Sequence, residues 1–582
     1  MPYSAPVRDL AFALQAAGHS DLLARAFPDL DDATVAAVLE AAGSFAAEVL
    51  APLNRTGDQI GARYADGAVT AAPGFAQAYR DYVAGGWTSL SADPAHGGQG
   101  LPKALDLAVF EMMNSANMAF TLCPMLTQAA VEALTLHGTP RQKALVLPKL
   151  VSGEWTGAMN LTEPQAGSDL AAVATRAAPD SQGGYRLDGQ KIFITWGDHD
   201  MAENICHLVL ARLPHASPGV KGISLFLAPK RLIGDDGRAG AANGLRPASI
   251  ERKLGIHGSP TCVMLYEDAQ AELVGEPGQG IAHMFVMMNA ARLQVGVEGV
   301  GIAEGAFQHA LAYAQERRQG RAAWSTESPA PIYGHPDVRR TLMLMKARTA
   351  AARGICLTTG VLADLARFAP TREEREAARA RQELLTPIAK AWSTEAGVEV
   401  ASLGVQVHGG MGYIEETGAA QLLRDARIAP IYEGTNGIQA VDLAGRKLDL
   451  TRGEAVRSLA AEMLATAEAL TENPELQPVG ARLAEGVAAL EHATAWLLDH
   501  RGPDSLAGAT PYLKLAGDVI GGWMLGREAL LAAGSPEPWL AAKAPLARLY
   551  ASQVLAQAPG VAAGVMAGGA DLEGVSAEAL AG

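Results

Sequence analysis

A glutamate in a loop before a predicted helix is the part of this sequence best suited to proton transfer. Glu433 follows Pro430 within the segment 431–439, IYEGTNGIQ. We expect a helix to begin at Thr435 or Asn436, which places the carboxylate just before it. Backbone N–H groups at such a position point outward and can stabilise a developing negative charge while the carboxylate takes a proton. A lone glutamate before a helix is usually a capping charge, so the neighbouring motifs decide between the two roles.

A glycine-rich segment begins 27 residues before Glu433. It reads QVHGGMGY over residues 406–413. Its glycines predict the end of a helix and leave the backbone free to approach a ligand closely. From the residues alone, the capping role of Glu433 stays the simpler interpretation.

Two further segments lie in a region of short strands. The loop 159–169, MNLTEPQAGSD, offers hydroxyls and glycine-freed backbone amides that could hold a phosphate group, although such a loop alone is more often a plain turn. The segment 191–195, KIFIT, predicts a strand whose alternation puts Phe193 and Thr195 on one face. That face could stack on and hydrogen-bond a planar ring, whereas Phe193 taken alone is more often a core residue.

A basic cluster follows a long helical pattern. Asn289 and Arg292 fall early in a helix predicted near 281–318, and we expect this one helix to end in the cluster 316–321, ERRQGR. For Arg318 and Arg321 the simpler interpretation is a solvated helix end whose positive charge complements the helix dipole.

The elements that must position these segments change along the chain. Residues 2–154 have helical spacing, residues 155–277 have short β-type runs between Gly, Pro and Asp turns, and long helices return from 281. The helices after that point are predicted near 281–318, 336–368, 372–403, 417–427 and 436–447. Residues 451–582 are also helical in pattern and carry apolar faces that must be buried, for example Leu483, Val487, Leu490, Ala493, Leu497 and Leu498. The fold class is therefore α+β and multidomain, mostly α.

Composition excludes several classes of function. The net charge of −15 disfavours a nucleic-acid or anionic-lipid partner, and no uncharged apolar stretch reaches 18 residues, so no membrane span is expected. The N-terminus does not resemble a signal peptide, which favours a cytoplasmic protein. GxGxxG after a strand, GxxxxGK[ST], GxSxG and HExxH motifs are absent. The acidic and histidine residues at 198–200 are more typical of a polar turn than of a metal site, so no metal is predicted.

Together these segments resemble the acyl-CoA dehydrogenase family, flavoenzymes that introduce an α,β double bond into acyl-CoA thioesters. The resemblance covers about residues 30–450, and the helical region beyond it is similar to that of long members of the family. It implies an N-terminal helical domain (1–156), a central β-barrel (157–280), a C-terminal four-helix bundle (281–450) and an additional helical domain (451–582). FAD is expected at the domain junction and across a dimer interface.

The resemblance also implies a role for each site residue. Glu433 would be the catalytic base and flavin N5 the hydride acceptor. The implied FAD contacts are Met159, Leu161, Thr162, Gly167, Ser168, Phe193, Ile194, Thr195, Arg317, Gln319, Gln406, Gly409, Gly410, Thr435 and Gly437, with Arg317 reaching the flavin phosphates of a neighbouring subunit. The implied substrate contacts are Ser168, Asn289, Arg292, Tyr432 and Gly434. Family members more often have Asp at the position of Asn289 and an aromatic residue at that of Gly320.

The predicted reaction converts an acyl-CoA, either fatty acyl-CoA or 3-methylmercaptopropionyl-CoA, to the trans-2-enoyl-CoA. Electrons would pass to an electron-transfer flavoprotein, and the enzyme would be a homo-oligomer, dimer or tetramer. An acyl-CoA oxidase using oxygen is a rival within the fold. A non-catalytic, nucleic-acid-binding relative is a rival of another class, and the 8 basic against 15 acidic residues after 450 argue against it.

Overall fold

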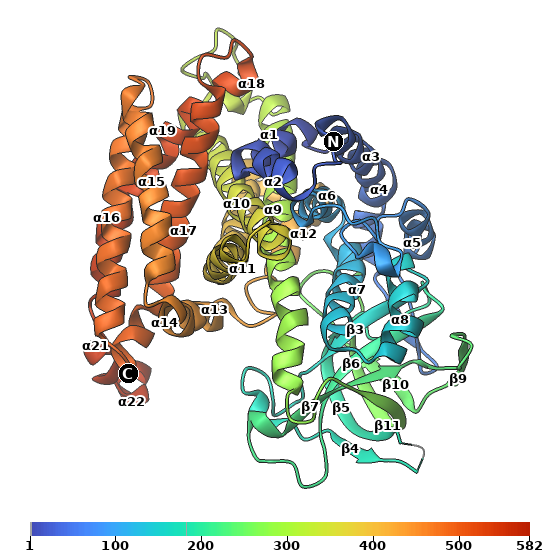
Figure 1. Cartoon of the computed structure of the whole chain (residues 1–582). Coiled ribbons are helices and arrows are strands. Elements are labelled where there is room, and N and C mark those ends of the chain that lie inside the picture. Colours follow the sequence, from blue (N-terminus) through green and yellow to red (C-terminus); the bar gives the residue numbers. More distant parts are fainter. Residues whose placement is uncertain (1–2, 182) are drawn as a thin grey trace. The chain divides into compact units, whose positions relative to one another are not determined.

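A computed structural model describes residues 3–181 and 183–582 and divides into two compact units. The helical unit comprises Met1–Gly43, Lys103–Ser115 and Val295–Gly582, of which the first two residues lie outside the described part. The strand-bearing unit comprises Ser44–Pro102 and Ala116–Gln294 (Figure 1).

The strand-bearing unit is built on a seven-stranded sheet. Its strands are β3 (Trp155–Asn160), β4 (Arg176–Pro179), β5 (Tyr185–Thr195), β6 (Asn204–Arg212), β7 (Ile223–Pro229), β10 (Leu245–Ile250) and β11 (Thr261–Val274). The order is β10-β11-β5-β4-β6-β3, and β7 pairs with both β11 and β6. Two small hairpins, β1 (Arg63–Ala65) with β2 (Ala68–Thr70) and β8 (Arg231–Ile233) with β9 (Ala239–Ala242), lie outside this sheet. The predicted closure into a barrel stays a prediction.

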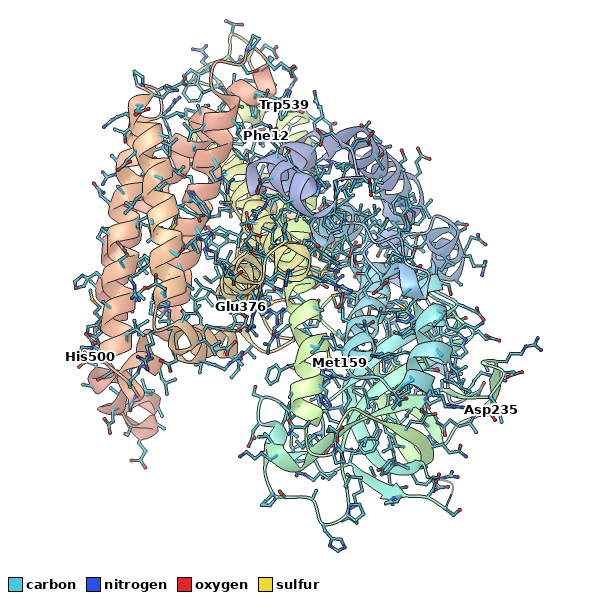
Figure 2. All side chains as sticks on the ribbon, viewed as in Figure 1. Phe12, Met159, Asp235, Glu376, His500 and Trp539 are labelled. Atoms are coloured by element: carbon cyan, nitrogen blue, oxygen red, sulfur yellow. The ribbon has the colours of Figure 1, made fainter. Side chains whose placement is uncertain are left out.

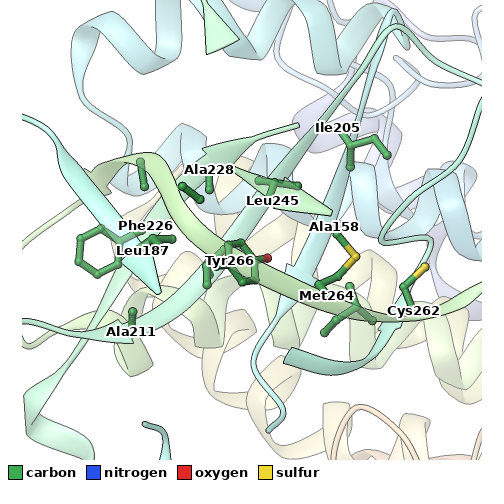
Figure 3. Packing of buried hydrophobic residues seen from close by; sticks show 14 of the residues in the cluster. Ala158, Leu187, Ile205, Ala211, Phe226, Ala228, Leu245, Cys262, Met264 and Tyr266 are labelled. Carbon is green, nitrogen blue, oxygen red and sulfur yellow. The ribbon is translucent and has the colours of Figure 1, made fainter. Parts of the chain in front are cut away.

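Buried apolar side chains of several strands form the core of this unit. Ala158, Leu187, Phe226 and Met264 belong to the cluster, which Figure 3 shows in close-up. Tyr266 lies among them and donates its hydroxyl to Asn160 Oδ1 at 2.8 Å, so this buried polar group is satisfied. The helices of the unit are α4 (Ala51–Ile60), α5 (Phe75–Ala84), α7 (Met118–His137) and α8 (Pro140–Ser152).

The helical unit contains the long helices expected after residue 281. Its elements up to residue 451 include α1 (Val7–Ala17), α2 (His19–Ala26), α10 (Pro336–Phe368), α11 (Arg372–His408), α12 (Ala419–Ala426), α13 (Asn436–Asp442) and α14 (Leu448–Thr451). Three more helices cross a boundary between the units: α3 (Asp32–Phe45), α6 (Lys103–Ala116) and α9 (Gly280–Glu316). Thr371 and Glu374 form a reciprocal capping box that fixes the start of α11.

The C-terminal region packs against the long helices of the same unit. Its helices are α15 (Glu454–Glu472), α16 (Gln477–Asp499), α17 (Pro503–Ala532), α18 (Pro538–Ala541), α19 (Lys543–Gln553), α20 (Ala558–Val565), α21 (Ala570–Glu573) and α22 (Ala577–Ala581), and α15, α16 and α17 run side by side (Figure 1). Trp392 of α11 donates to Asp518 Oδ1 at 3.0 Å. A Cβ placed on Gly517 would lie 2.2 Å from the Trp392 ring, so the two helices meet closely where only glycine fits.

The N-terminal helix also contacts this region. The rings of Phe12 and Trp539 meet edge to face at 5.7 Å, side by side in Figure 2. Lys543 pairs with buried Glu528 at 2.8 Å and with Asp9 of α1 at 3.4 Å. Five residues of the predicted apolar faces are buried, namely Leu483, Val487, Leu490, Ala493 and Leu497, whereas Leu498 is only half-buried. The region after 450 is thus a packed part of the helical unit.

Three details differ from the sequence-based expectations. The β1–β2 hairpin interrupts a stretch expected to be helical; it is held by pairing of Arg63 with Thr70 and Ala65 with Ala68 across the turn. Helix α9 ends at Glu316, so the basic residues 317–321 follow the helix instead of ending it. Helix α11 runs to His408, five residues beyond the predicted 403, and stops at Gly409, whose φ of 60° suits glycine.

Two helical stretches are apolar and long enough to cross a membrane by length and composition alone. They are Asp32–Ile60 and Met118–His137, and the second is mostly buried. Core helices of soluble proteins meet the same criterion, so the finding is weak evidence for a span.

Candidate active site

The loop that carries Glu433 has an unusual backbone conformation. Glu433 has φ of 56° and Gly434 has φ of 82°, so two consecutive residues are left-handed. A non-glycine residue pays a conformational cost there and persists only when its surroundings impose the conformation. The next residue, Thr435, caps α13 by accepting a hydrogen bond from the Ile438 N–H at 3.3 Å. The predicted start of this helix is confirmed.

Buried polar side chains hold the backbone of this loop. Lys390 of α11, which is fully buried, donates to the Gly434 carbonyl and to Asn436 Oδ1, both at 2.9 Å. Gln439 donates to the carbonyls of Glu433 and Gly434 at 3.3 and 3.4 Å. Because both carbonyls are occupied from inside the protein, the strained conformation is imposed by tertiary contacts.

Tyr432 links the loop to a buried carboxyl group on α9. Its hydroxyl donates to Glu298 Oε2 of α9, and Glu298 is fully inaccessible to solvent. Burial raises the pKa of Glu298 to about 8, and the nearby Glu433 charge adds to the rise while the Tyr432 hydrogen bond and Lys390 oppose it. At neutral pH the uncharged acid is therefore favoured. The Tyr432 hydroxyl is engaged, so its predicted substrate contact would have to use the ring.

The C-terminal parts of α9 and α11 contact each other in the helical unit. The His408 ring stacks on His309 and Tyr313 of α9 at 4.6 and 4.4 Å. Arg317 follows one turn later, and its carbonyl accepts the Ile332 N–H at 2.8 Å. The predicted FAD residues at these two helix ends are all exposed: Arg317, Gln319, Gln406, Gly409 and Gly410.

These helix ends lie far from the Glu433 loop within one chain. Gln406 is sixteen residues beyond Lys390 on α11, which is about 24 Å of helix. The helical unit thus holds two separate sets of predicted site residues, one around Glu433 and one around Gly409.

A bulge in β5 presents Phe193 to the surface. Ile194 pairs with Cys262 and Lys191 with Met264, so two residues of β5 lie opposite the single residue Val263. Phe193 lies at this bulge with φ of 58°, and 59% of its surface is exposed. Bulges re-aim side chains next to functional sites. The bulge therefore exposes the aromatic ring of Phe193, and the simpler interpretation of Phe193 as a core residue is wrong.

The loop after β3 is tied to the same strand. The Ile192 N–H donates to the Thr162 carbonyl at 2.9 Å, and Lys191 donates to the Leu161 carbonyl at 3.0 Å. The structure therefore brings the loop 159–169 and the strand 191–195 together. Gly167 and Ser168 lie exposed at the tip of this loop, while Met159 is buried on β3.

An ion pair beneath this loop is fully enclosed. Lys191 and Glu163 meet at 2.7 Å, and Glu163 also accepts from the Thr175 N–H at 3.0 Å. Burial raises the pKa of Glu163, but Lys191 and the hydrogen bonds outweigh it and hold the pKa at about 2. The pair anchors the loop on which several predicted flavin contacts lie.

Lys191→Met is expected to destabilise the protein by roughly 3 to 5 kcal/mol, because it leaves Glu163 charged and buried without its partner. Lys149→Met removes an exposed pair with Glu154 and should change the free energy of unfolding by less than about 1 kcal/mol. The depressed pKa of Glu163 gives stability that is present above about pH 4.5 and is lost as the pH falls toward about 2. Denaturant unfolding across this range measures both effects; equal stability of Lys191→Met and wild type would refute the anchoring role.

The predicted substrate residues on α9 contact each other. Arg292 donates to Asn289 Oδ1 at 3.1 Å, and its guanidinium lies 5.5 Å from the centre of the Phe285 ring. Asn289 is exposed and Arg292 is buried. The amide therefore performs the pairing that an aspartate would perform at this position, without the negative charge.

The polar residues 198–200 are structural. Asp198 accepts the Val69 N–H and Asp200 the Ala71 N–H, each at 2.9 Å, and His199 accepts the Met201 N–H at 3.1 Å. These bonds fix the segment around β2. Over residues 3–181 and 183–582, no cluster of three or more His, Cys, Asp or Glu side chains could hold a metal ion.

Sequence reasoning missed the residues that hold the Glu433 loop, namely Glu298, Lys390 and Gln439. A signal for the first two was present: each is a charged residue in an apolar helical run, VGVEGVG and PIAKAW. Charged residues in such runs are buried with partners. The partners of Glu298 and Lys390 are set by tertiary packing, which the local sequence pattern does not reveal.

The sequence matches four family models. They are the acyl-CoA dehydrogenase N-terminal domain over residues 33–154, the middle domain over 158–269, the C-terminal domain over 278–448 and an acetyl-CoA dehydrogenase C-terminal-like domain over 459–575. A 3-methylmercaptopropionyl-CoA dehydrogenase of Ruegeria pomeroyi is 48% identical, and the match spans 96% of this chain and 97% of that protein.

Two solved structures have the same fold. Caenorhabditis elegans ACDH-11 in complex with C11-CoA gives a TM-score of 0.78 at 21% identity, covering 95% of this chain and 92% of that one. An acyl-CoA dehydrogenase of Bacillus anthracis complexed with FAD gives 0.75 at 21% identity, covering 94% and 90%. Both likenesses confirm N-terminal helical, middle β and C-terminal helical regions.

Proposed function

Because this chain belongs to the acyl-CoA dehydrogenase family, we propose that it oxidises 3-methylmercaptopropionyl-CoA or a fatty acyl-CoA to the trans-2-enoyl-CoA and passes the electrons to an electron-transfer flavoprotein. Family membership makes the protein an oxidoreductase with FAD as its cofactor. The 48% identity over nearly the full length of both chains favours the sulfur-containing substrate as the first to test. A homo-oligomer in the cytoplasm, dimer or tetramer, is part of the same proposal.

The residues present are suited to holding FAD. Phe193 offers an exposed aromatic face, with half-buried Thr195 two residues further on the strand. A Cβ added at Gly167, Gly409 or Gly410 would meet nothing within 4 Å, so ligand atoms have room beside these backbones. The exposed Arg317 supplies positive charge for a phosphate. FAD held by these residues would supply the hydride acceptor that the oxidation of the substrate β-carbon needs.

Glu433 is the proposed base for the α-proton. A thioester α-hydrogen is only weakly acidic, so the carboxylate must be held on one face of the substrate while backbone amides stabilise charge on the carbonyl oxygen. The loop geometry supports this assignment: Lys390 and Gln439 hold the carbonyls of residues 433 and 434, which fixes the backbone that carries the Glu433 carboxylate. Such preorganisation is what proton transfer from a weak carbon acid requires.

An anaerobic screen of acyl-CoAs with a ferrocenium-type acceptor tests the proposal. We expect turnover of 3-methylmercaptopropionyl-CoA and of short fatty acyl-CoAs, and no turnover of free acids. Aeration of the substrate-reduced enzyme tests the oxidase alternative: rapid reoxidation with peroxide formation would identify an oxidase, whereas slow reoxidation supports the dehydrogenase. A flavin-loaded protein that no acyl-CoA reduces would refute the proposal.

A further inference from the structure

Glu298 has no role in the proposed chemistry, yet it contacts the loop that carries Glu433. Its side chain is fully inaccessible, its Oε2 accepts the Tyr432 hydroxyl, and Tyr432 directly precedes Glu433. The other oxygen, Oε1, has no hydrogen-bond partner among the described residues. A buried carboxyl group with one oxygen unpaired is costly for the fold, so its presence here needs a local reason.

The loop provides that reason. The left-handed backbone at Glu433 and Gly434 is held at its carbonyls by Lys390 and Gln439, which fix the chain after Glu433. On the preceding side, the Tyr432 N–H donates to the Ile428 carbonyl at 3.1 Å, and the Tyr432 hydroxyl connects the loop to Glu298 of α9. Without that tie, the backbone just before Glu433 could relax from its strained conformation and carry the carboxylate with it.

We propose that Glu298 is a positioning residue for the reaction, which through the Tyr432 hydroxyl fixes the loop that presents Glu433 to the substrate. The inference rests on the proposed function, because it takes Glu433 as the base. The charged and titratable groups that face Glu298 are Tyr432 and Glu433 from the loop and Lys390 from α11. With its raised pKa, Glu298 is uncharged at neutral pH, so it supports the loop without placing a second negative charge beside Glu433.

A glutamine at this position should replace the acid well. The amide oxygen of Glu298→Gln can still accept the Tyr432 hydroxyl, whereas Glu298→Leu leaves that hydroxyl buried without its acceptor. Displacement of a catalytic group by about 1 Å can cost about 100-fold in rate. Glu298→Leu is therefore expected to slow flavin reduction by acyl-CoA by about 10- to 100-fold with little change in acyl-CoA affinity. Glu298→Gln should stay within about threefold of wild type.

The test is anaerobic stopped-flow reduction of the FAD-loaded full-length protein by 3-methylmercaptopropionyl-CoA and butyryl-CoA. Wild type, Glu298→Gln, Glu298→Leu, Tyr432→Phe and the double variant Glu298→Leu/Tyr432→Phe are compared for reduction rate and apparent substrate affinity. If Glu298 acts through Tyr432, the double variant is no slower than the slower single variant. Effects that multiply, or a Glu298→Leu enzyme that is reduced as fast as wild type, would overturn the proposal.

Glu304 provides the matched control. It lies six residues later on α9, is equally enclosed, and pairs with Arg353 at 2.8 Å, away from the loop contacts. Glu304→Gln should lower the thermal midpoint of unfolding while leaving the reduction rate unchanged, which separates loss of fold stability from loss of positioning. If wild type itself is not reduced by any acyl-CoA, the proposed function falls and this inference with it. If wild type is reduced by acyl-CoA and the Glu298 variants are reduced at the same rate, the positioning role is refuted while the proposed function stands.

Discussion

Glu433→Gln is expected to bind FAD normally and to lose flavin reduction by acyl-CoA almost entirely. An amide cannot accept the α-proton, and a positioned general base contributes about 10²- to 10⁴-fold to such a step. The substitution keeps the size and hydrogen-bonding shape of the side chain, and the carbonyl contacts from Lys390 and Gln439 involve only the backbone. Flavin absorbance after purification and anaerobic reduction by acyl-CoA measure the two properties separately.

Glu415→Gln is a suitable control for that experiment. Glu415 pairs with Arg424 on the surface of the same unit, with 62% of its side chain exposed. Its neutralisation should leave the reduction rate at the wild-type value. Reduction of Glu433→Gln at the wild-type rate would place the base elsewhere in the protein.

Removal of residues 451–582 is expected to give an aggregating protein, or one with weaker self-association or altered acyl-chain preference. The truncation would uncover Trp392, which is 4% exposed and is covered by Gly517, and would remove Lys543 from Asp9. Newly exposed apolar faces of long helices are aggregation sites. Size-exclusion chromatography and the acyl-CoA screen detect these outcomes.

A short truncation after Gly574 is the matched control. Residues 575–582 are all exposed and follow the last buried residue, Gly569, whose N–H binds Asp504 at 2.8 Å. This variant should keep the stability, assembly and substrate profile of the full chain. A protein ending at 450 that behaves the same way would show that the C-terminal region is dispensable.

Long periodic helices could be predicted closely from the sequence. The segment predicted at 336–368 is α10 with the same bounds, and that predicted near 281–318 is α9, Gly280–Glu316. Pro336 favours a helix start and the glycines after α11 favour a helix end, and both preferences depend only on the local chain. The 436–447 segment was less regular than expected, since α13 passes into a π-helical turn at Leu443–Lys447.

Features that depend on distant partners could not be predicted. The alternation in KIFIT predicts one face for Phe193 and Thr195, but the bulge that exposes Phe193 arises from the register of β5 against β11. Tyr432 and Glu298 are 134 residues apart in sequence, so no local pattern pairs them. The position of Glu433 before a helix was predictable; the contacts that give its backbone a left-handed conformation were not.

The most direct test of the account is single-turnover oxidation of one equivalent of acyl-CoA by the FAD-loaded protein without oxygen or another acceptor. We predict that the flavin is bleached and that mass spectrometry finds an equal amount of enoyl-CoA, two hydrogens lighter than the substrate. Deuterium at the α-carbon should slow the bleaching in wild type, because flavin reduction requires Glu433 to remove that hydrogen as a proton. An intact acyl-CoA after incubation, or a bleached flavin without enoyl-CoA, would contradict the assignment.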